Sequence, residues 1–286
     1  MTASSAGTST AGEGATVSQP LPADLQMYHQ FEFPDGTIVP GFFDLRETVH
    51  RLPIPADLSG KRCLDVASAT GFFAIEMARR GGSVVSVDID DPARWDWQGP
   101  PGLNAARSGG RGEIRHGFEI ARAAFGVDVE RHDLSLYDLT PEALSTFDFV
   151  FMGNILLHLS DPARGLRAVR RMVAPDGEFV SFESISLPLT FARPFTAVAE
   201  LWRDDAPTWW KHNLRGHRRL VEAGGFRVLE HSRPFLVPLG DAIPRRPANI
   251  PRHAHEWAYW LFTRRFGSGG SWLRAVPRSL DGETSS

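Results

Sequence analysis

Three aspartates lie where apolar, strand-like runs of the sequence end, a position from which carboxylates can reach a ligand. Asp65 is the next-to-last residue of the first run, Asp88 ends the second, and Asp133 directly follows the third. The first run continues into small residues, Ala67 to Gly71, which let the backbone approach a ligand at the carboxyl end of a strand. An acid at the end of the second strand is placed to hold ribose hydroxyls. Asp133 could accept a hydrogen bond from the exocyclic amine of a purine.

The elements that must position these residues are apolar runs that alternate with helical patterns. The strand-like runs are Arg62–Val66, Ser83–Asp88, Val127–His132, Phe147–Met152 and Glu178–Glu183, and the helical patterns are Gly71–Arg80, Ile114–Phe125 and Pro162–Val173. Apolar strands separated by helices predict a parallel sheet that is covered on both faces. Further along, we expect helices at Phe191–Arg203 and Lys211–Ala223 and strands at Phe226–Ser232 and Glu256–Arg264. The predicted fold is therefore α/β, with a doubly wound, mostly parallel sheet of seven strands.

The chain divides into four predicted segments. Residues 1–25 and 267–286 are rich in small and polar residues, so we expect flexible tails at both ends. Residues 26–60 are expected to form an N-terminal lid or helical extension. Residues 61–266 then make up the main domain, with an insertion after the fifth strand at about 184–215.

Composition excludes several classes of protein. The chain has 286 residues, of which 42% are hydrophobic and 23% charged, and no apolar run approaches the ~20 residues needed to cross a bilayer. The single cysteine excludes a disulfide scaffold, and no His, Asp and Glu cluster has convincing metal spacing, so we expect no metal. The net charge of −3 gives no basic excess for nucleic acid. We expect a cytoplasmic protein without a membrane partner.

The order and spacing of these residues resemble the class I S-adenosylmethionine-dependent methyltransferases. The commonest form of their first motif is Asp-x-Gly-x-Gly-x-Gly, which here runs from Asp65 to Gly71 with alanine at positions 67 and 69. The segment that ends in His158 and the following Asp161-Pro162 also match the family's pattern after the fourth strand. The resemblance covers roughly residues 61–183 and implies a Rossmann-like methyltransferase fold. It implies S-adenosyl-L-methionine as cofactor, bound by Asp65, Ala67, Ala69, Gly71, Asp88, Ile89, Asp133, Leu134, Gly153 and Asn154.

A narrower resemblance lies outside this core. The entry segment from Met27 to Arg46, the run Trp209–Asn213 and the turn Ala223–Phe226 are similar to those of methyltransferases related to the wobble-uridine carboxymethyl-transferring tRNA enzymes. That group also contains methyltransferases with natural-product substrates. The resemblance therefore does not identify a substrate.

Methyl transfer is an in-line displacement, which depends mainly on positioning of the reactants. A base is needed only where the acceptor must lose a proton. We expect His158 to be that base, with His29 as the second candidate. Because adjacent residues at a helix start cannot both face one core, one of Trp209 and Trp210 is expected to face a pocket or a partner. The residues expected to contact the acceptor are Tyr28, His29, Glu183, Trp209 and Trp210.

Three functions remain open at this point. The first is a methyltransferase that acts on an oxygen or nitrogen of a small-molecule acceptor, including natural products. The second is a tRNA wobble-uridine modifying transferase, which the overall acidity and the near absence of lysine disfavour. The third is a non-catalytic partner subunit with the methyltransferase fold, which the alanines at 67 and 69 leave open. A nicotinamide-dependent dehydrogenase fits worse, because no clean Gly-x-Gly-x-x-Gly is present.

Overall fold

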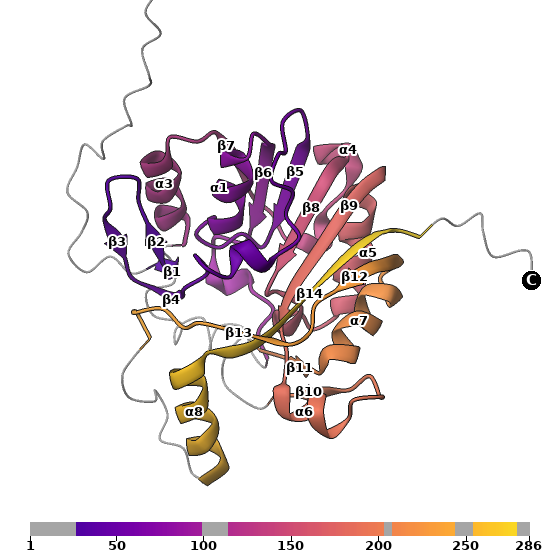
Figure 1. Cartoon of the computed structure of the whole chain (residues 1–286). Helices are drawn as coiled ribbons and strands as arrows, with labels where there is room; N and C mark the ends of the chain where they lie inside the picture. The colour runs from indigo at the N-terminus through magenta and orange to yellow at the C-terminus, as the bar shows by residue number, and fades with distance from the viewer. Residues whose placement is uncertain (1–26, 99–113, 203–207, 244–253, 279–286) are drawn as a thin grey trace, which may run out of the picture.

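The computed structural model describes residues 27–98, 114–202, 208–243 and 254–278, and a twisted sheet forms its centre (Figure 1). The strands of this sheet are β5 (Arg62–Val66), β6 (Ser83–Asp88), β7 (Val129–Asp133), β8 (Phe147–Gly153), β9 (Val173–Ser184), β12 (Phe226–His231), β13 (Phe235–Val237) and β14 (Ser268–Pro277). Seven of them lie in the order β12-β14-β9-β8-β5-β6-β7, and β13 pairs with β14 as an eighth. The strands β5 to β9 pair in parallel, whereas β14 is antiparallel to its partners. This confirms the predicted α/β fold with a mostly parallel sheet.

Helices cover both faces of the sheet, as its apolar strands require. On one face lie α1 (Phe72–Arg79) and α3 (Ile114–Phe125), and on the other lie α4 (Pro141–Leu144), α5 (Pro162–Met172) and α7 (Leu214–Ala223). Side chains alternate along β5 accordingly: Cys63 packs in the core beside α1, whereas Leu64 and Val66 pack in the core beside α5. Within the described residues, no helix is both long and apolar enough to cross a bilayer.

The N-terminal segment consists of short strands rather than the expected helical extension. These strands are β1 (Met27–His29), β2 (Phe31–Glu32), β3 (Ile38–Val39) and β4 (Gly41–Phe43), followed by the 3-10 turn η1 (Val49–Arg51). β1 pairs in parallel with β4, and β2 forms a hairpin with β3. Met27, Phe31 and Phe33 are buried in the same core as α1 and α3. The apolar residues of the N-terminal segment thus pack it against α1 and α3.

The C-terminal expectations were wrong for residues 254–277. The expected strand Glu256–Arg264 lies within a helix, α8 (Ala254–Phe266), and the last strand is β14, which lies inside the expected tail. The glycines that suggested flexibility are required by close packing instead. A β-carbon on Gly269 would come within 2.8 Å of the Ile185 carbonyl, and one on Gly270 within 2.7 Å of the Val237 side chain. The expected N-terminal tail and residues 279–286 lie outside the described residues.

The insertion after β9 also differs from the expected pair of long helices. It contains α6 (Leu187–Ala192), β10 (Ala199–Leu201) and β11 (Trp210–His212), and β10 pairs with β11 in antiparallel fashion. The helix expected from Lys211 begins only at Leu214, because the Asn213 side chain caps it by accepting the Gly216 N–H at 2.7 Å. Short 3-10 turns complete the described structure: η2 (Pro92–Arg94), η4 (Leu136–Asp138) and η5 (Leu156–His158).

Candidate active site

A cavity of about 790 Å³ opens at the carboxyl ends of the parallel strands. This is the edge at which open α/β sheets bind their ligands. One part of the cavity is lined by the ends of β5, β6 and β8, and the other by β1, β4, β11 and α8. Of the residues expected at the site, the cavity brings together Tyr28, His29, Ala67, Ala69, Asp88, Ile89, Leu134, Gly153, Asn154, His158 and Trp210. The five others, Asp65, Gly71, Asp133, Glu183 and Trp209, are not among its lining residues.

The turn after β5 has the backbone of a glycine loop although alanines occupy two of its positions. Ala67 and Ala69 have φ angles of 60° and 47°, and Gly71 has a φ angle of 81°. Left-handed backbone costs an L-residue about 1–2 kcal/mol, so the surroundings must hold the two alanines in place. Gly71 lies just before α1, where a β-carbon would meet the ring of Phe118. The loop therefore keeps a positive φ at all three positions despite both substitutions.

Asp88 links this loop to the end of β6. Its Oδ2 accepts the backbone N–H of Ala69 at 2.6 Å, and its Oδ1 accepts the N–H of Ile89 at 2.7 Å. Burial raises the pKa of Asp88, whereas the Arg131 guanidinium and the two backbone N–H groups oppose that rise. A carboxylate offers about four lone-pair positions, so two remain for the hydroxyls of a ligand. Asp88 can thus hold the loop and bind the hydroxyls of a ribose at the same time.

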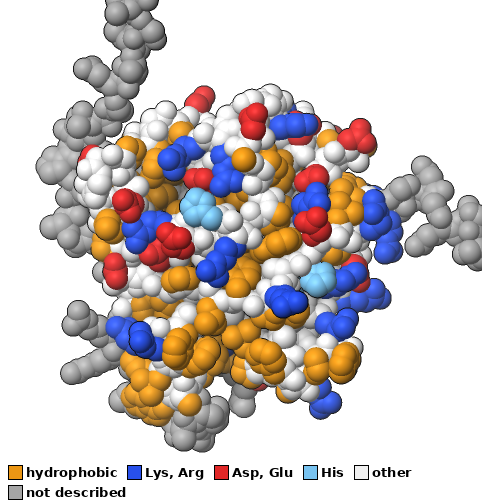
Figure 2. Space-filling model, viewed as in Figure 1, with side chains coloured by type: hydrophobic (Ala, Val, Ile, Leu, Met, Phe, Trp, Pro, Cys, Tyr) orange, Lys and Arg blue, Asp and Glu red, His pale blue; other side chains and the backbone are white. Residues whose placement is uncertain are grey.

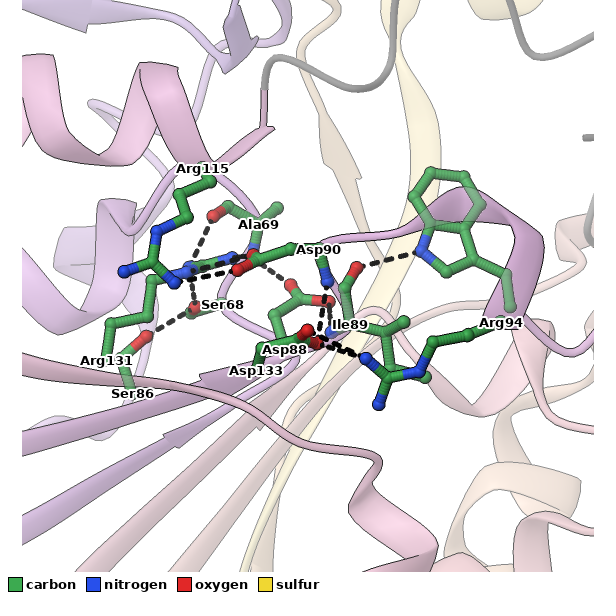
Figure 3. A network of polar contacts seen from close by, with 11 residues as sticks. Ser68, Ala69, Ser86, Asp88, Ile89, Asp90, Arg94, Arg115, Arg131 and Asp133 are labelled. Atoms are coloured by element: carbon green, nitrogen blue, oxygen red, sulfur yellow. Dashed lines mark hydrogen bonds and ion pairs between the residues drawn. The ribbon is translucent and has the colours of Figure 1, made fainter.

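A buried arginine on β7 holds the same loop from below (Figure 3). The side chain of Arg131 is 2% exposed, and its Nη1 donates to Ser68 Oγ at 2.9 Å and to the Ala69 carbonyl at 3.0 Å. Its Nη2 forms an ion pair with Asp90 at 2.7 Å. The guanidinium also lies 4.7 Å from the centroid of the Phe118 ring. One of these two hydrogen bonds is made to Ala69 itself, and the other to Ser68, which lies between the two strained alanines.

Asp133 belongs to this network and does not line the cavity. Its carboxylate pairs with Arg94 at 2.7 Å and accepts the backbone N–H of Asp90 at 3.1 Å. Arg94, which follows β6, therefore bonds both oxygens of the carboxylate that was expected to accept a purine amine. Burial would raise the pKa of Asp90, but hydrogen bonds from Arg131 and Arg115 outweigh it and lower that pKa.

Asp65 and Glu183 are buried and do not line the cavity. Each is 1% exposed, and burial raises the pKa of each carboxyl to about 8. The Oε1 of Glu183 accepts the backbone N–H groups of Ile155 and Leu156 at 3.0 and 3.1 Å. Glu183 therefore fixes the start of η5, the turn that ends at His158.

The two candidate histidines differ in environment. His29 is 6% exposed, its Nδ1 lies 3.2 Å from Thr70 Oγ1, and burial lowers its pKa to about 3. A histidine with so low a pKa stays neutral at pH 7 and is a poor proton acceptor. His158 lines the cavity at the end of η5, where Glu183 holds the preceding backbone. The geometry therefore favours His158 over His29 as a base.

The adjacent tryptophans point to different places, as neighbouring residues of an extended segment do. Trp210 lines the cavity, and its indole N–H donates to the Leu159 carbonyl at 3.0 Å. The indole N–H of Trp209 donates to the Asp96 carbonyl at 2.5 Å. Trp209 therefore connects the segment that follows β6 with the start of β11. The expected acceptor contact can therefore come from Trp210 but not from Trp209.

Residues that the sequence did not single out complete the outer part of the cavity. Lys211 lies on β11, with its Nζ 3.0 Å from the centroid of the Trp202 ring and 4.8 Å from that of Tyr259. Tyr259, Trp260 and Arg264 come from α8, which had been expected to be a strand. The expected strand, Glu256–Arg264, gave no amphipathic signal for a helix. Within the described parts of the chain, no group of three or more His, Cys, Asp or Glu could hold a metal ion.

The strand order, the loop after β5 and Asp88 define an α/β protein with a site for a nucleoside-type cofactor at one sheet edge. Residues 42–231 match the family described as methyltransferase domain, so the chain belongs to the methyltransferase domain family. This confirms the expected methyltransferase family.

The curated relatives match only in part. The chain is 31% identical over 131 residues to the ubiquinone biosynthesis O-methyltransferase of Pseudomonas syringae pv. tomato, which is 46% of this chain and 47% of that protein. It is 30% identical over 136 residues to the enzyme of the same name from Xanthomonas oryzae pv. oryzae, 48% of each chain. The chain thus spans about half the length of the curated relatives it matches.

A solved structure of similar fold is the 1,6-didemethyltoxoflavin-N1-methyltransferase of Burkholderia thailandensis, with S-adenosylhomocysteine bound. It is 15% identical, has a TM-score of 0.46, and the match covers 77% of this chain and 72% of that one.

Proposed function

We propose that this protein transfers a methyl group from S-adenosylmethionine to an oxygen or nitrogen atom of a small-molecule acceptor. The observation that carries the proposal is the two-part cavity. The loop with Ala69 and the carboxylate of Asp88 line one part, and apolar and aromatic side chains from outside the sheet line the other. Its volume of about 790 Å³ lies in the upper part of the ~300–1,000 Å³ typical of ligand pockets. The names of the curated relatives support an O-methyltransferase.

Each group of cavity residues has a separate role in the proposed reaction. The Ala67–Gly71 loop and Asp88 hold the cofactor, which supplies an electrophilic methyl carbon when bound. Tyr28 and Trp210 line the part of the cavity where the acceptor is positioned in line with that carbon. His158 accepts the proton that a hydroxyl acceptor loses as its oxygen bonds to the methyl carbon. His29, kept neutral by burial, orients the acceptor through a hydrogen bond and takes no proton.

Turnover by His158 variants tests the proposal directly. The full chain is incubated with S-adenosylmethionine and a panel of phenolic, catechol and amine acceptors, and S-adenosylhomocysteine is measured. We expect His158→Ala to lower kcat by ~10²–10⁴-fold while cofactor affinity stays near that of the unaltered protein. His132→Ala is the matched control, because His132 pairs with Glu130 and does not line the cavity. Turnover within a few-fold of normal in His158→Ala would remove His158 from the mechanism.

The narrower resemblance to the wobble-uridine tRNA group stays a prediction, as does the cytoplasmic location. The entry segment that carries it, Met27 to Arg46, forms part of the cavity wall through Tyr28, Phe42 and Phe43. Binding to bulk tRNA that weakens steeply with salt would support that function. Cofactor binding with no turnover on any acceptor would support the partner subunit instead. Neither result is expected.

A further inference from the structure

The helix α8 covers the cavity with one side and exposes apolar side chains on the other. The side that lines the cavity consists of Tyr259, Trp260, Thr263 and Arg264. On a helix with 3.6 residues per turn, Leu261 and Phe262 then fall on the opposite side, and Trp257 falls at the boundary beside Arg264. The exposed fractions of Trp257, Leu261 and Phe262 are 39%, 55% and 41%. The helix stands away from the sheet layers at the lower end of Figure 1.

The exposed side of α8 is basic as well as apolar. The ten residues from Trp257 to Phe266 contain six large apolar or aromatic residues, two arginines and no acid. Arg265 is exposed and falls on the same side as Leu261. Figure 2 shows hydrophobic side chains over this lower end, whereas most acidic side chains of the same face lie in its upper half. Tryptophan and phenylalanine are typical of side chains at a lipid interface, where an arginine can lie among the head groups.

Further aromatic side chains are exposed at the same end of the molecule. Phe191 on α6 is 75% exposed, and Phe195 just after it is 86% exposed. Soluble monomers rarely expose large apolar patches without a function for them. Figure 1 places α6 and α8 at the same end of the fold.

The charge on α8 selects between the two simplest partners. In a symmetric dimer the same patch meets itself, so Arg265 would approach its own copy, and the segment from Trp257 to Phe266 offers no acid to neutralise it. An anionic lipid surface instead attracts Arg265 and accepts the apolar side chains around it. The earlier expectation of no membrane partner rested on the lack of a spanning run. A helix that lies on the surface needs no such run.

We propose that α8 docks on an anionic lipid bilayer, with Trp257, Leu261 and Phe262 in the interface and Arg265 among the head groups. Because the other side of α8 lines the cavity, docking brings the cavity wall next to the lipid. An acceptor dissolved in the membrane could then reach the site along α8. Docking does not depend on the proposed methyl transfer, and each is tested separately.

Co-sedimentation of the full chain with vesicles tests the docking. We expect binding to phosphatidylcholine vesicles that contain 30% phosphatidylglycerol, and much weaker binding to pure phosphatidylcholine. Arg265→Glu should weaken binding ~25-fold, because each charge near such a surface contributes about fivefold. Leu261→Ser combined with Phe262→Ser should weaken it more than tenfold. Ile38→Ser is the matched control, since Ile38 is 51% exposed on β3, which lies apart from α8 (Figure 1).

Cofactor affinity, measured on every variant, shows that the fold is kept. No binding to the anionic vesicles, or equal binding by Arg265→Glu and the unaltered chain, would overturn the proposal. So would a concentration-dependent dimer in analytical ultracentrifugation that the Leu261→Ser and Phe262→Ser variant loses, because the surface would then belong to a second copy.

Discussion

Replacing Arg131 with methionine removes the two hydrogen bonds that hold the loop after β5. A methionine of similar length keeps its apolar stem against Phe118, so the main loss is the guanidinium. Ser68 Oγ retains Ser86 Oγ as a partner at 2.6 Å, whereas no other bond to the Ala69 carbonyl is described. The change therefore acts on the loop that is proposed to hold the cofactor.

The backbone strain of the two alanines and the stabilisation by the Arg131 hydrogen bonds are of similar size. Ala67 and Ala69 in left-handed backbone cost roughly 2–4 kcal/mol together. A hydrogen bond from a charged donor contributes about 1.5–3 kcal/mol, so two such bonds offset strain of that order. Without them the loop leaves the binding conformation more often, and the apparent cofactor Kd rises as the competent fraction falls. We expect Arg131→Met to raise Kd ~30-fold, which corresponds to about 2 kcal/mol.

With glycines in the loop, cofactor affinity should depend less on Arg131. In a background that carries Ala67→Gly and Ala69→Gly, the strain is absent, so Arg131→Met should raise Kd less than ~5-fold. The difference is a coupling of about 1 kcal/mol, which a double-mutant cycle by isothermal titration calorimetry resolves. Arg115→Met is the control, because Arg115 pairs with the same Asp90 at 2.9 Å but is half exposed and makes no bond to the loop. The same fold-loss in both backgrounds would refute the compensation.

Three further predictions follow from single residues. Gly71→Ala should lower stability by roughly 2–4 kcal/mol in chemical denaturation, because of its positive φ and the Phe118 ring; an unchanged midpoint would contradict this. Burial raises the pKa of Glu183 to about 8 from 4.5, so the unfolded chain loses this proton first and stability falls as pH rises between those values. The melting temperature of Glu183→Gln should therefore fall less from pH 6 to 8, and parallel curves would argue against it. Trp210→Ala should raise the acceptor KM with cofactor Kd changed less than ~3-fold, whereas Trp209→Ala should lower stability instead.

The core of the fold could be predicted because its signals are local. The strands β5, β6 and β8 and the helices α1, α3 and α5 fall within two residues of the expected ranges. Each combines an apolar run with clear ends, such as Asp161, whose side chain caps α5 by accepting the Arg164 N–H at 2.9 Å. Such signals depend on neighbours within a few positions, which the sequence shows directly.

The C-terminal part could not be predicted in the same way. Long-range packing explains β14, where Gly269 and Gly270 leave space for side chains from elsewhere in the chain, and no local pattern reveals that. The helix α8 is apolar on the exposed side as well as on the cavity side, so it lacks the amphipathic period that identifies a helix.

The predicted strand ends place the acids near the carboxyl ends of the parallel strands, but they do not indicate which acids face the cavity. Asp88 lines it, whereas Asp133 pairs with Arg94 and Glu183 holds the backbone before His158. Each outcome depends on a partner that a separate segment brings to the carboxylate. Position along a strand therefore predicts the neighbourhood of a site, and the ion pairs around it decide which residues remain for a ligand.

The alanines at 67 and 69 illustrate why a weakened motif need not mean a lost site. Glycine serves in such a loop because it adopts left-handed backbone without strain and lets a ligand approach. Here the backbone conformation is kept, and a buried guanidinium about 60 positions further on bonds the segment that carries the strain. Arg131 is therefore part of the cofactor motif in space although no pattern of neighbouring residues contains it. If it compensates the alanines as the distances indicate, chains that regain the glycines should tolerate its loss.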